Sequence, residues 1–291
     1  LLYFTTTTGL AVVDDLHHWR QRRLAAVLSH LAVFVVLVAG VFGSGDKQRV
    51  NVTTQVGHTT HVGLTDDGEQ VQLPFALTLK EFTMDEYPPK LYVLDTRTES
   101  SSMDFLSVEA EGVAADIEGW HIVAERSIDM AGRRTESGEW QQMEHIGAAP
   151  AVYVRARHTL SGEEFEGWVS CGSFIFEPSY LMLGGRYAVA MPRREAKRYL
   201  SRVELLNEEG QTHLYNIEVN HPARVGGWYI YQMGYDTQRG RWSEVSVLEC
   251  VRDGWYSAVH IALWMMLAAG VVMFLTAGGR KSAKPRKEEK R

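Results

Sequence analysis

The sequence is poor in the residues and motifs that mark most catalytic centres. Only two of its 291 residues are cysteine, Cys171 and Cys250, and no CxxC pair occurs. G-x-S-x-G, P-loop and H-E-x-x-H motifs are also absent. Thiol-redox sites and cysteine-ligated zinc sites typically have cysteines at close spacing, and with these motifs absent the sequence predicts no self-contained hydrolytic or redox centre. The two cysteines could form a disulfide in an oxidising compartment or remain two buried thiols.

Histidines are more numerous but scattered. Eleven occur, and His58 and His61 lie close together in the sequence HTTH. Side chains three positions apart on a strand point to opposite faces of the sheet. This pair therefore does not predict a two-histidine metal site.

Two stretches of twenty residues, 24–43 and 257–276, contain no charged residue. As helices, each would be about 30 Å long, which is the thickness of a bilayer core. Buried core helices are the alternative, although globular helices of this length usually keep a polar face. We predict two transmembrane helices.

Both stretches carry mostly small residues at alternating four- and three-residue steps. In the first stretch these are Ala25, Ser29, Ala32, Val36, Ala39 and Gly43, and in the second Ala258, Ala262, Met265, Ala269, Val272 and Thr276. Small residues at this spacing let helix backbones approach closely in lipid. We expect each helix to pack along its small-residue seam.

Basic flanks set the orientation of the two spans. Residues 14–23 contain three arginines, and residues 277–291 contain seven lysines or arginines. The positive-inside rule places both flanks in the cytoplasm, and hence residues 44–256 outside the cytoplasmic (inner) membrane, on the periplasmic side. Residues 1–13 are apolar and begin without Met, so we interpret them as the stub of an incomplete upstream membrane segment. The predicted protein is multi-pass.

The net charge of −6 is unevenly distributed. Residues 1–43 carry +1 and residues 257–291 carry +5, which leaves −12 on residues 44–256. An acidic outer domain disfavours nucleic acid as a partner and is compatible with a basic protein partner. A solvated acidic surface is the simpler interpretation of the number alone.

Residues 44–256 have the pattern of β-structure. Short runs rich in Val, Thr and aromatics, such as VQLPFALTLKEFTM, alternate with turn sequences such as DDG, SGEE, NEEG and QRG. This spacing predicts a mainly β, membrane-anchored protein: an extracytoplasmic antiparallel β-sandwich or open barrel flanked by transmembrane α-helices. Short helices are expected around Arg193–Leu200 and near Ala114–Ile122.

The most informative stretch is VNHPARVGGWYIYQMGYD, residues 219–236. Pro222 favours an extended conformation at His221, and Gly227 with the glycine before it supplies a turn. WYIYQMGY then predicts a strand rich in aromatic residues. Such a strand could form a hairpin with an aromatic core face, or an exposed aromatic ledge for the membrane or a flat apolar ligand.

This stretch resembles the ResB-type (ResB/CcsB-like) cytochrome c biogenesis proteins. The residues that carry the resemblance are Asn220, His221, Pro222, Gly227, Trp228, Tyr231, Gln232 and Tyr235. SHLAVFVVLVAGVFGSGD, GWVSCGSF, MPRREAKRYLSRVEL and SVLECVRDGW support it. The resemblance extends from about Arg22 to Thr276.

The resemblance implies a membrane subunit of the system that attaches haem to apocytochrome c outside the cytoplasmic membrane. It implies a polytopic partner of the ResC/CcsA type, with haem held transiently and shared with that partner, and contact with apocytochrome c and membrane lipid. The chain offers no obvious acid, base or nucleophile for thioether formation. We therefore expect a non-catalytic or co-catalytic subunit of a haem-lyase complex.

Two histidines in the spans are candidate haem ligands. His30 lies about 9 Å inside the first span, where lipid offers imidazole no partner. The resemblance implies that it binds haem iron together with a partner histidine, and an interhelical hydrogen bond is the alternative. His260, the weaker candidate, lies near the outer end of the second span, where it can also hydrogen-bond headgroups.

The depths of His30 and His260 in the bilayer differ by about 16 Å. Two axial nitrogens on one iron are only about 4 Å apart, so these histidines cannot share a haem. No metal is expected beyond haem iron bound through His30.

Two other functions stay open. One is a membrane-anchored scaffold or binding module without a cofactor, which would recruit an extracytoplasmic protein through the acidic domain. The other is a thiol-redox protein that uses Cys171 and Cys250. The second is weaker, because thiol reduction in such systems usually belongs to separate CxxC proteins.

Overall fold

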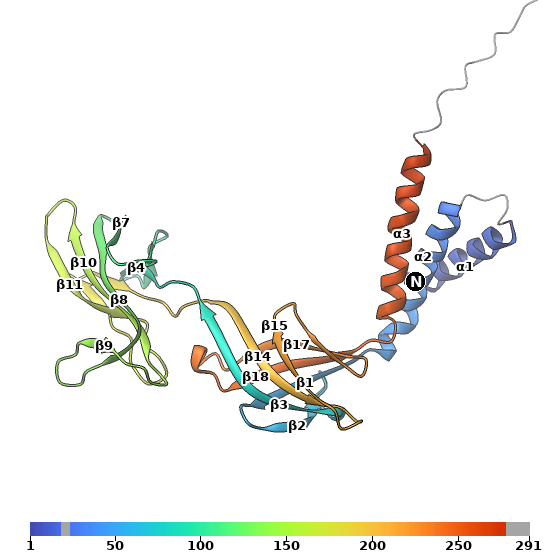
Figure 1. Ribbon diagram of the computed structural model, residues 1–291. Coiled ribbons are helices and arrows are strands. Elements are labelled where there is room, and N and C mark those ends of the chain that lie inside the picture. The colour runs from blue at the N-terminus through green and yellow to red at the C-terminus, as the bar shows by residue number, and fades with distance from the viewer. Residues whose placement is uncertain (19–23, 278–291) are drawn as a thin grey trace, which may run out of the picture. The chain divides into compact units, whose positions relative to one another are not determined.

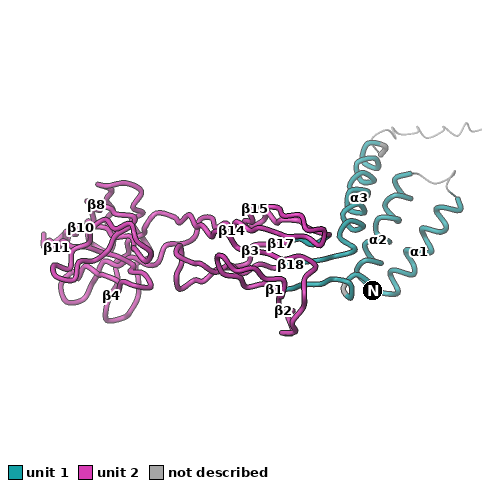
Figure 2. Tube along the Cα trace, turned by 60° about the horizontal axis from the view of Figure 1, so that its bottom comes forward, with its two compact units in different colours: residues 1–50, 227–229, 250–291 teal, residues 51–226, 230–249 magenta. Residues whose placement is uncertain are grey.

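The computed structural model describes residues 1–18 and 24–277, and the chain divides into two compact units (Figure 2). Unit 1 comprises Leu1–Val50, Gly227–Tyr229 and Cys250–Arg291. Unit 2 comprises Asn51–Gly226 and Ile230–Glu249. The helices of the described chain that are longer than one turn lie in unit 1, and most of the β-structure lies in unit 2.

Unit 1 contains the helices α1 (Leu2–His17), α2 (Leu24–Asp46) and α3 (Tyr256–Ala277) (Figure 1). The windows Leu24–Gly43 in α2 and Tyr256–Leu275 in α3 are long and apolar enough to cross a membrane. They agree with the two predicted spans to within one residue at each end.

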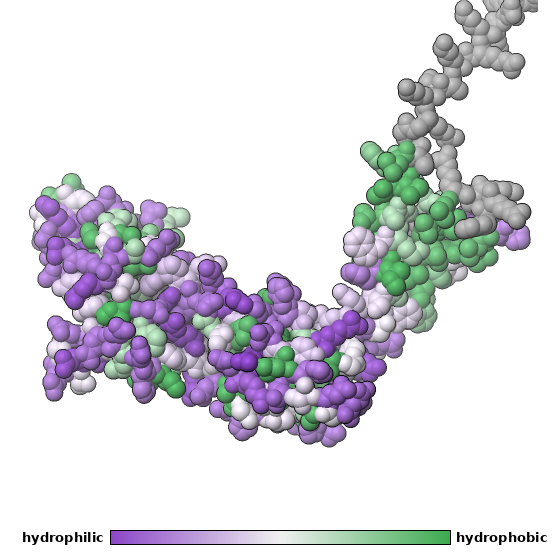
Figure 3. Space-filling view, viewed as in Figure 1, coloured by the Kyte–Doolittle hydropathy of each residue, from purple (hydrophilic) through white to green (hydrophobic). Residues whose placement is uncertain are grey.

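Helix α3 exposes many of its apolar side chains, and the helices of unit 1 carry a hydrophobic surface in the view of Figure 3. Ile261 is 61% exposed, Trp264 is 62% exposed and Phe274 is 79% exposed. A core helix of a water-soluble domain would bury these groups, because apolar patches of this extent are avoided in water. The exposure favours a membrane helix over a core helix.

The small-residue seams form the contact surfaces of the helices. Ala25, Ala32 and Ala39 of α2 are buried, and so are Ala262 and Ala269 of α3. Helix α2 packs against both α1 and α3. Alanine side chains at this spacing allow close backbone approach, as expected from the sequence.

Unit 2 contributes most of an eight-stranded sheet. Its strands, in spatial order, are β15 (Thr212–Glu218), β14 (Ala196–Leu206), β3 (Gln70–Glu86), β2 (Thr59–Leu64), β1 (Gln48–Gln55), β18 (Val245–Arg252), β17 (Trp228–Tyr235) and β16 (Ala223–Val225). The pairs from β1 to β15 run antiparallel. One face of this sheet carries the apolar residues expected of an alternating pattern.

Strand β3 shows how that face is maintained. Alternate residues from Leu73 to Leu79 are buried, and the next buried residue is Phe82 rather than residue 81. The register with β14 shifts at this point, where Arg202 pairs with Glu81 but Val203 pairs with Leu79. This bulge at Lys80 inserts one residue and returns Phe82 to the buried face.

Two smaller sheets form a sandwich within unit 2. The first sheet contains β7 (Val113–Ile117), β8 (Trp120–Arg133), β9 (Trp140–Gln142), β10 (Ala149–His158) and β11 (Glu164–Ser170). The second contains β4 (Lys90–Asp95), β5 (Ser100–Ser101), β6 (Leu106–Ser107), β12 (Leu181–Leu183) and β13 (Tyr187–Ala190). One core joins the two sheets, with Ile122 and Val154 from the first and Leu91 and Val189 from the second. The mainly β, antiparallel character is therefore confirmed.

The helix expected around Arg193–Leu200 was wrong. Residues from Ala196 onward form β14, which pairs with β3 on one side and β15 on the other. Ser201, Val203 and Leu205 are buried at alternate positions, which is the pattern of a strand. This alternation begins only after the charged run RREAKR. Backbone pairing on both edges outweighs the helix propensity of the preceding RREAKRYL.

The helix expected near Ala114–Ile122 was also wrong. This segment is a hairpin in which β7 and β8 pair antiparallel. Its turn residues Glu118 and Gly119 have φ angles of 49° and 81°. Two consecutive positive φ angles produce the tight turn whose twist matches that of paired strands.

Candidate functional site

An aspartate and a histidine form a close pair in unit 1. Nδ1 of His30 in α2 lies 2.6 Å from Oδ2 of Asp15 in α1. The side chain of Asp15 is only 4% exposed, whereas that of His30 is 47% exposed. A buried carboxylate is costly unless it is paired, and His30 supplies the partner. The interhelical hydrogen bond considered for His30 from the sequence is thus present.

This hydrogen bond determines which nitrogen of His30 is available. An ionised carboxylate can only accept hydrogen bonds, so the proton of the neutral ring lies on Nδ1. Nε2 then carries the lone pair of the ring. Metal-binding histidines are commonly oriented by a carboxylate in this way, so the pair is compatible with axial ligation by His30.

Close packing of α1 on α2 brings Asp15 to His30. Gly9 of α1 lies against the ring of Phe34 in α2, and a Cβ at Gly9 would be 2.9 Å from Cε2 of that ring. A larger residue would force the helices apart.

The four threonines of α1 do not compete for contacts at this interface. Each of Thr5, Thr6, Thr7 and Thr8 donates its hydroxyl proton to a backbone carbonyl of the preceding turn. Their polar groups are satisfied within the helix, which suits an apolar environment.

His260 lies in a column of rings on α3. Its ring stacks on Tyr256 at 5.6 Å and 21°, and meets Trp264 edge-on at 6.4 Å. Tyr256 in turn packs against Tyr229 at 5.4 Å. No hydrogen bond or ion pair joins His260 to another described residue. A ligand role for His260 stays a prediction, and its surroundings are those of an interfacial ring.

The NHP sequence forms a tight reversal before β16. Glu218 and His221 exchange backbone hydrogen bonds of 3.3 and 3.1 Å. Asn220 between them has a φ of 67°, a left-handed conformation that asparagine tolerates better than most residues. Pro222 follows the reversal, where its missing N–H removes no ladder bond. The role of this motif in the fold is therefore a turn.

A second reversal turns β16 into β17, where Gly226 and Gly227 have φ angles of 53° and 82°. The hairpin expected from the sequence is therefore confirmed. On β17, Trp228 is buried, and Tyr231 is half-buried on the opposite face. Trp228 therefore fits the hairpin with an aromatic core face and not the exposed aromatic ledge.

Gln232 belongs to a buried polar network. Its Nε2 donates to Oγ of Ser246 at 3.0 Å, and the hydroxyls of Ser246 and Ser201 are 2.7 Å apart. All three side chains are buried. Because buried polar groups must find partners, this network fixes the alignment of β14, β17 and β18.

Tyr235 at the end of β17 contacts two further rings. Its ring centroid is 5.5 Å from that of Phe82 and 5.0 Å from that of Tyr199. Burial raises the pKa of its hydroxyl. Tyr235 also lines a cavity whose wall includes four arginines.

We call this cavity the arginine cavity. It has a volume of about 140 Å³ and is lined by Arg193, Arg194, Arg239 and Arg241. Arg193 and Arg194 lie between β13 and β14. Arg239 precedes the short 3-10 helix η1 (Gly240–Trp242), which contains Arg241. The arginines come from two segments more than forty residues apart in the sequence.

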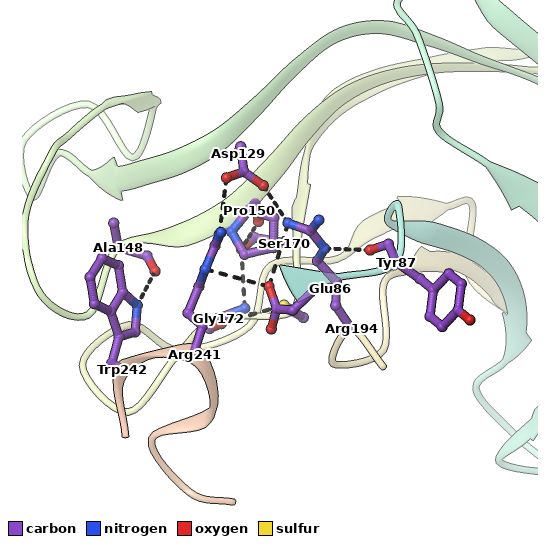
Figure 4. Close-up of polar contacts among 11 residues, drawn as sticks. Glu86, Tyr87, Asp129, Ala148, Pro150, Ser170, Gly172, Arg194, Arg241 and Trp242 are labelled. Carbon is purple, nitrogen blue, oxygen red and sulfur yellow. Dashed lines mark hydrogen bonds and ion pairs between the residues drawn. The ribbon is translucent and has the colours of Figure 1, made fainter. Parts of the chain in front are cut away.

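Two carboxylates hold Arg194 and Arg241 in place. Nη1 of Arg194 and Nε of Arg241 each lie 3.6 Å from Oε2 of Glu86, at the end of β3. Asp129 of β8 accepts hydrogen bonds from Nη1 of Arg194 and, at 3.0 Å, from Nη1 of Arg241. Figure 4 shows the two guanidiniums between these carboxylates.

The carboxylates respond differently to this environment. Burial raises the pKa of Glu86, and the neighbouring arginines oppose the shift only partly. For Asp129, burial also acts to raise the pKa, but the contacts with Arg194 and Arg241 outweigh it and lower the pKa. Glu86 is therefore the carboxylate whose charged form is the less well solvated by its surroundings.

Cys171 also lines the arginine cavity. Burial raises the pKa of its thiol to about 11, so little thiolate is present at neutral pH. Cys171 and Cys250 are both buried, and the possible disulfide between them stays a prediction. A thiol-redox role is correspondingly disfavoured.

The sequence contains a signal for the arginine cavity. RR at 193–194 and RGR at 239–241 are arginine clusters in an otherwise acidic segment. GWVSCGSF and MPRREAKRYLSRVEL, which carry part of the ResB resemblance, both supply residues to the cavity wall. Among the residues that the structure describes, no group of three or more His, Cys, Asp or Glu is placed to hold a metal ion.

Comparison with known proteins supports the resemblance over part of the chain. The model of the ResB-like family matches residues 176–262. The matched segment includes the NHP reversal, β17 and all four arginines of the cavity, and it ends in α3. No curated protein matches the chain.

Proposed function

We propose that this ResB-type protein serves cytochrome c biogenesis as a membrane subunit that holds haem through His30. The family match suggests a role in cytochrome c biogenesis, and the two apolar helices suggest a membrane protein. We further propose that residues 44–256 face the periplasm, because basic residues flank both helices on the other side.

The observation that carries the proposal is the hydrogen bond between His30 and Asp15. Its length of 2.6 Å, together with the burial of Asp15, holds the ring in one orientation. Nε2 is left as the ligating atom. A histidine that served only to join two helices would not need a buried carboxylate as its partner, because a neutral acceptor would suffice.

The role of each residue follows from this geometry. Haem, as cargo, supplies the iron and the vinyl groups that become thioethers. His30 would bind the iron through Nε2, and Asp15 would position the ring and increase its basicity. The opposite axial ligand would come from a ResC/CcsA-type partner, because His260 lies too far along the membrane normal to share the iron. Apocytochrome c would then be the acceptor of the haem.

The test is the haem content of the complex of this chain with its membrane partner. His30→Ala should abolish the Soret absorbance of the purified complex and the formation of c-type cytochromes. Added imidazole should restore the absorbance, because it can occupy the vacated ligand position. His18→Ala is the matched control, since His18 pairs with the exposed Asp14. Unchanged haem content in His30→Ala would overturn the ligand role.

A scaffold without cofactor is the second candidate, and the charge of −12 on residues 44–256 favours it. An acidic domain can recruit a basic protein without haem. A stable but colourless complex would support this function, and a Soret band that depends on His30 would exclude it.

A further inference from the structure

The arginine cavity contains more positive than negative charge. Arg194 and Arg241 face Glu86 and Asp129, and Arg239 donates to Glu244 at 2.9 Å. Arginine stays protonated in proteins, so these three cations meet three carboxylates.

Arg193 is the fourth cation, and no carboxylate of the described residues pairs with it. Its Nη1 donates to the backbone carbonyls of Thr237 and Gln238, at 3.3 and 3.5 Å. One positive charge is left over at an exposed residue of the cavity wall. It lies within a segment whose net charge is strongly negative, so the excess is local to this cavity.

Hydrogen-bond donors remain available in the cavity. Within the described chain, Nη2 of Arg193, Arg194 and Arg241 donates no hydrogen bond. The contacts from Arg194 and Arg241 to Oε2 of Glu86 are ion pairs of 3.6 Å, longer than hydrogen bonds. Guanidinium groups with free N–H bonds are suited to bind planar oxyanions through two parallel hydrogen bonds.

The size and walls of the cavity restrict the anion. Its volume of about 140 Å³ is several times the roughly 30 Å³ that a water molecule occupies in the liquid. Met84, Pro150 and Trp242 supply apolar wall. A single excess charge and apolar walls fit a monoanion with a short hydrocarbon arm better than a phosphate dianion.

We propose that the arginine cavity binds a carboxylate carried on a short apolar arm, and that Arg193 supplies the net charge for this binding. Two sources have this chemistry, namely a haem propionate and the carboxylate of a peptide. The proposal does not depend on ligation by His30, and it can succeed or fail separately from it.

The test measures binding of propionate to the full chain in detergent by saturation-transfer NMR. Propionamide, the neutral isostere, serves as the ligand control. Wild-type protein should bind propionate and not propionamide. Arg193→Gln should raise the Kd for propionate about tenfold, which corresponds to about 1.4 kcal/mol, because the substitution removes the excess positive charge that attracts the carboxylate.

Arg202→Gln is the matched protein control. Arg202 is exposed on β14 outside the cavity, and its nearest carboxylate, Glu81, is 3.9 Å away. It should bind propionate as the wild type does. Equal binding of propionate and propionamide, no binding by the wild type, or equal affinity in Arg193→Gln and wild type would each overturn the proposal.

Competition experiments then identify the source of the carboxylate. Iron-free mesoporphyrin IX displaces propionate if the cavity accepts a haem propionate, and its dimethyl ester does not. A short peptide with a free carboxyl terminus displaces propionate if the cavity accepts a peptide, and the amidated peptide does not. If esterified and amidated competitors displace propionate as well as the acids do, recognition of a carboxylate is excluded.

Discussion

Nε1 of Trp255 donates a hydrogen bond to Oδ2 of Asp46 at 2.9 Å, which joins the end of α2 to the residue before α3. The same indole covers Gly43, where a Cβ would lie 3.2 Å from Cδ1 of Trp255. The two apolar helices are therefore connected at one end by a polar contact in addition to their alanine seam.

Trp255→Phe should weaken this connection. The substitution keeps an aromatic ring over Gly43 but removes the indole N–H, and an intramolecular hydrogen bond contributes about 1 kcal/mol. Thermal unfolding of the helices, followed by circular dichroism in detergent, should shift to lower temperature. Trp264→Phe is the control, because Trp264 is 62% exposed and should show little change. Equal shifts in the two variants would show that the hydrogen bond adds no stability.

Asp15→Asn tests whether Asp15 acts on haem through His30, and it rests on the proposed function. Asparagine keeps the size of the side chain and can accept from Nδ1, but it removes the negative charge. Because an anionic partner stabilises ferric more than ferrous iron, the reduction potential of the bound haem should rise in a redox titration of the complex.

The matched control for this variant is Asp14→Asn. Asp14 is adjacent in sequence but exposed and paired with His18, so the potential should not move. If Asp15→Asn also leaves the potential of a haem-bearing complex unchanged, Asp15 does not act on the ligand.

Glu86→Gln should make the protein more stable at neutral pH. The folded-state pKa of Glu86 lies above the ordinary value of 4.5, because burial disfavours its charged form. The folded protein then holds this proton more tightly than the unfolded chain, so the stability that depends on Glu86 falls as the pH rises above 4.5. Glutamine carries no charge at any pH and avoids this loss.

Chemical unfolding at several pH values measures this effect. The advantage of Glu86→Gln should be present at pH 7 and should disappear below about pH 4, where the wild-type carboxyl is protonated in both states. Glu81→Gln is the control, because Glu81 is exposed and its ion pair with Arg202 is long, at 3.9 Å. A destabilised Glu86→Gln at pH 7 would show that its ion pairs outweigh its burial.

The elements that the sequence predicted correctly are those with a simple period. Ala25, Ala32 and Ala39 follow the helical step, so their packing face could be predicted without knowing the partner helix. Leu73 to Leu79 follow the alternation of a strand. Gly226 and Gly227 indicated their turn because only glycine adopts two positive φ angles at no steric cost.

The parts that could not be predicted depend on residues far apart in the sequence. Asp15 was assigned to a cytoplasmic flank beginning at residue 14, whereas α1 continues through His17. Its pairing with His30 requires the packing of two helices, which no local pattern encodes. The arginine cavity likewise combines Glu86, Arg194 and Arg241 from three segments. The sequence shows that these charged residues are present, but it does not show that they lie together in the folded chain.

The extra residue at Lys80 has an effect beyond its own strand. Phe82 faces inward only because of this insertion in β3, and its ring supports Tyr235, which forms part of the wall around Arg193. A chain one residue shorter at this point would keep Leu73 to Leu79 in place and turn Phe82 toward solvent. The shape of the arginine cavity is thus set by the length of a strand, and a genetic deletion there would damage the cavity without removing any of its arginines.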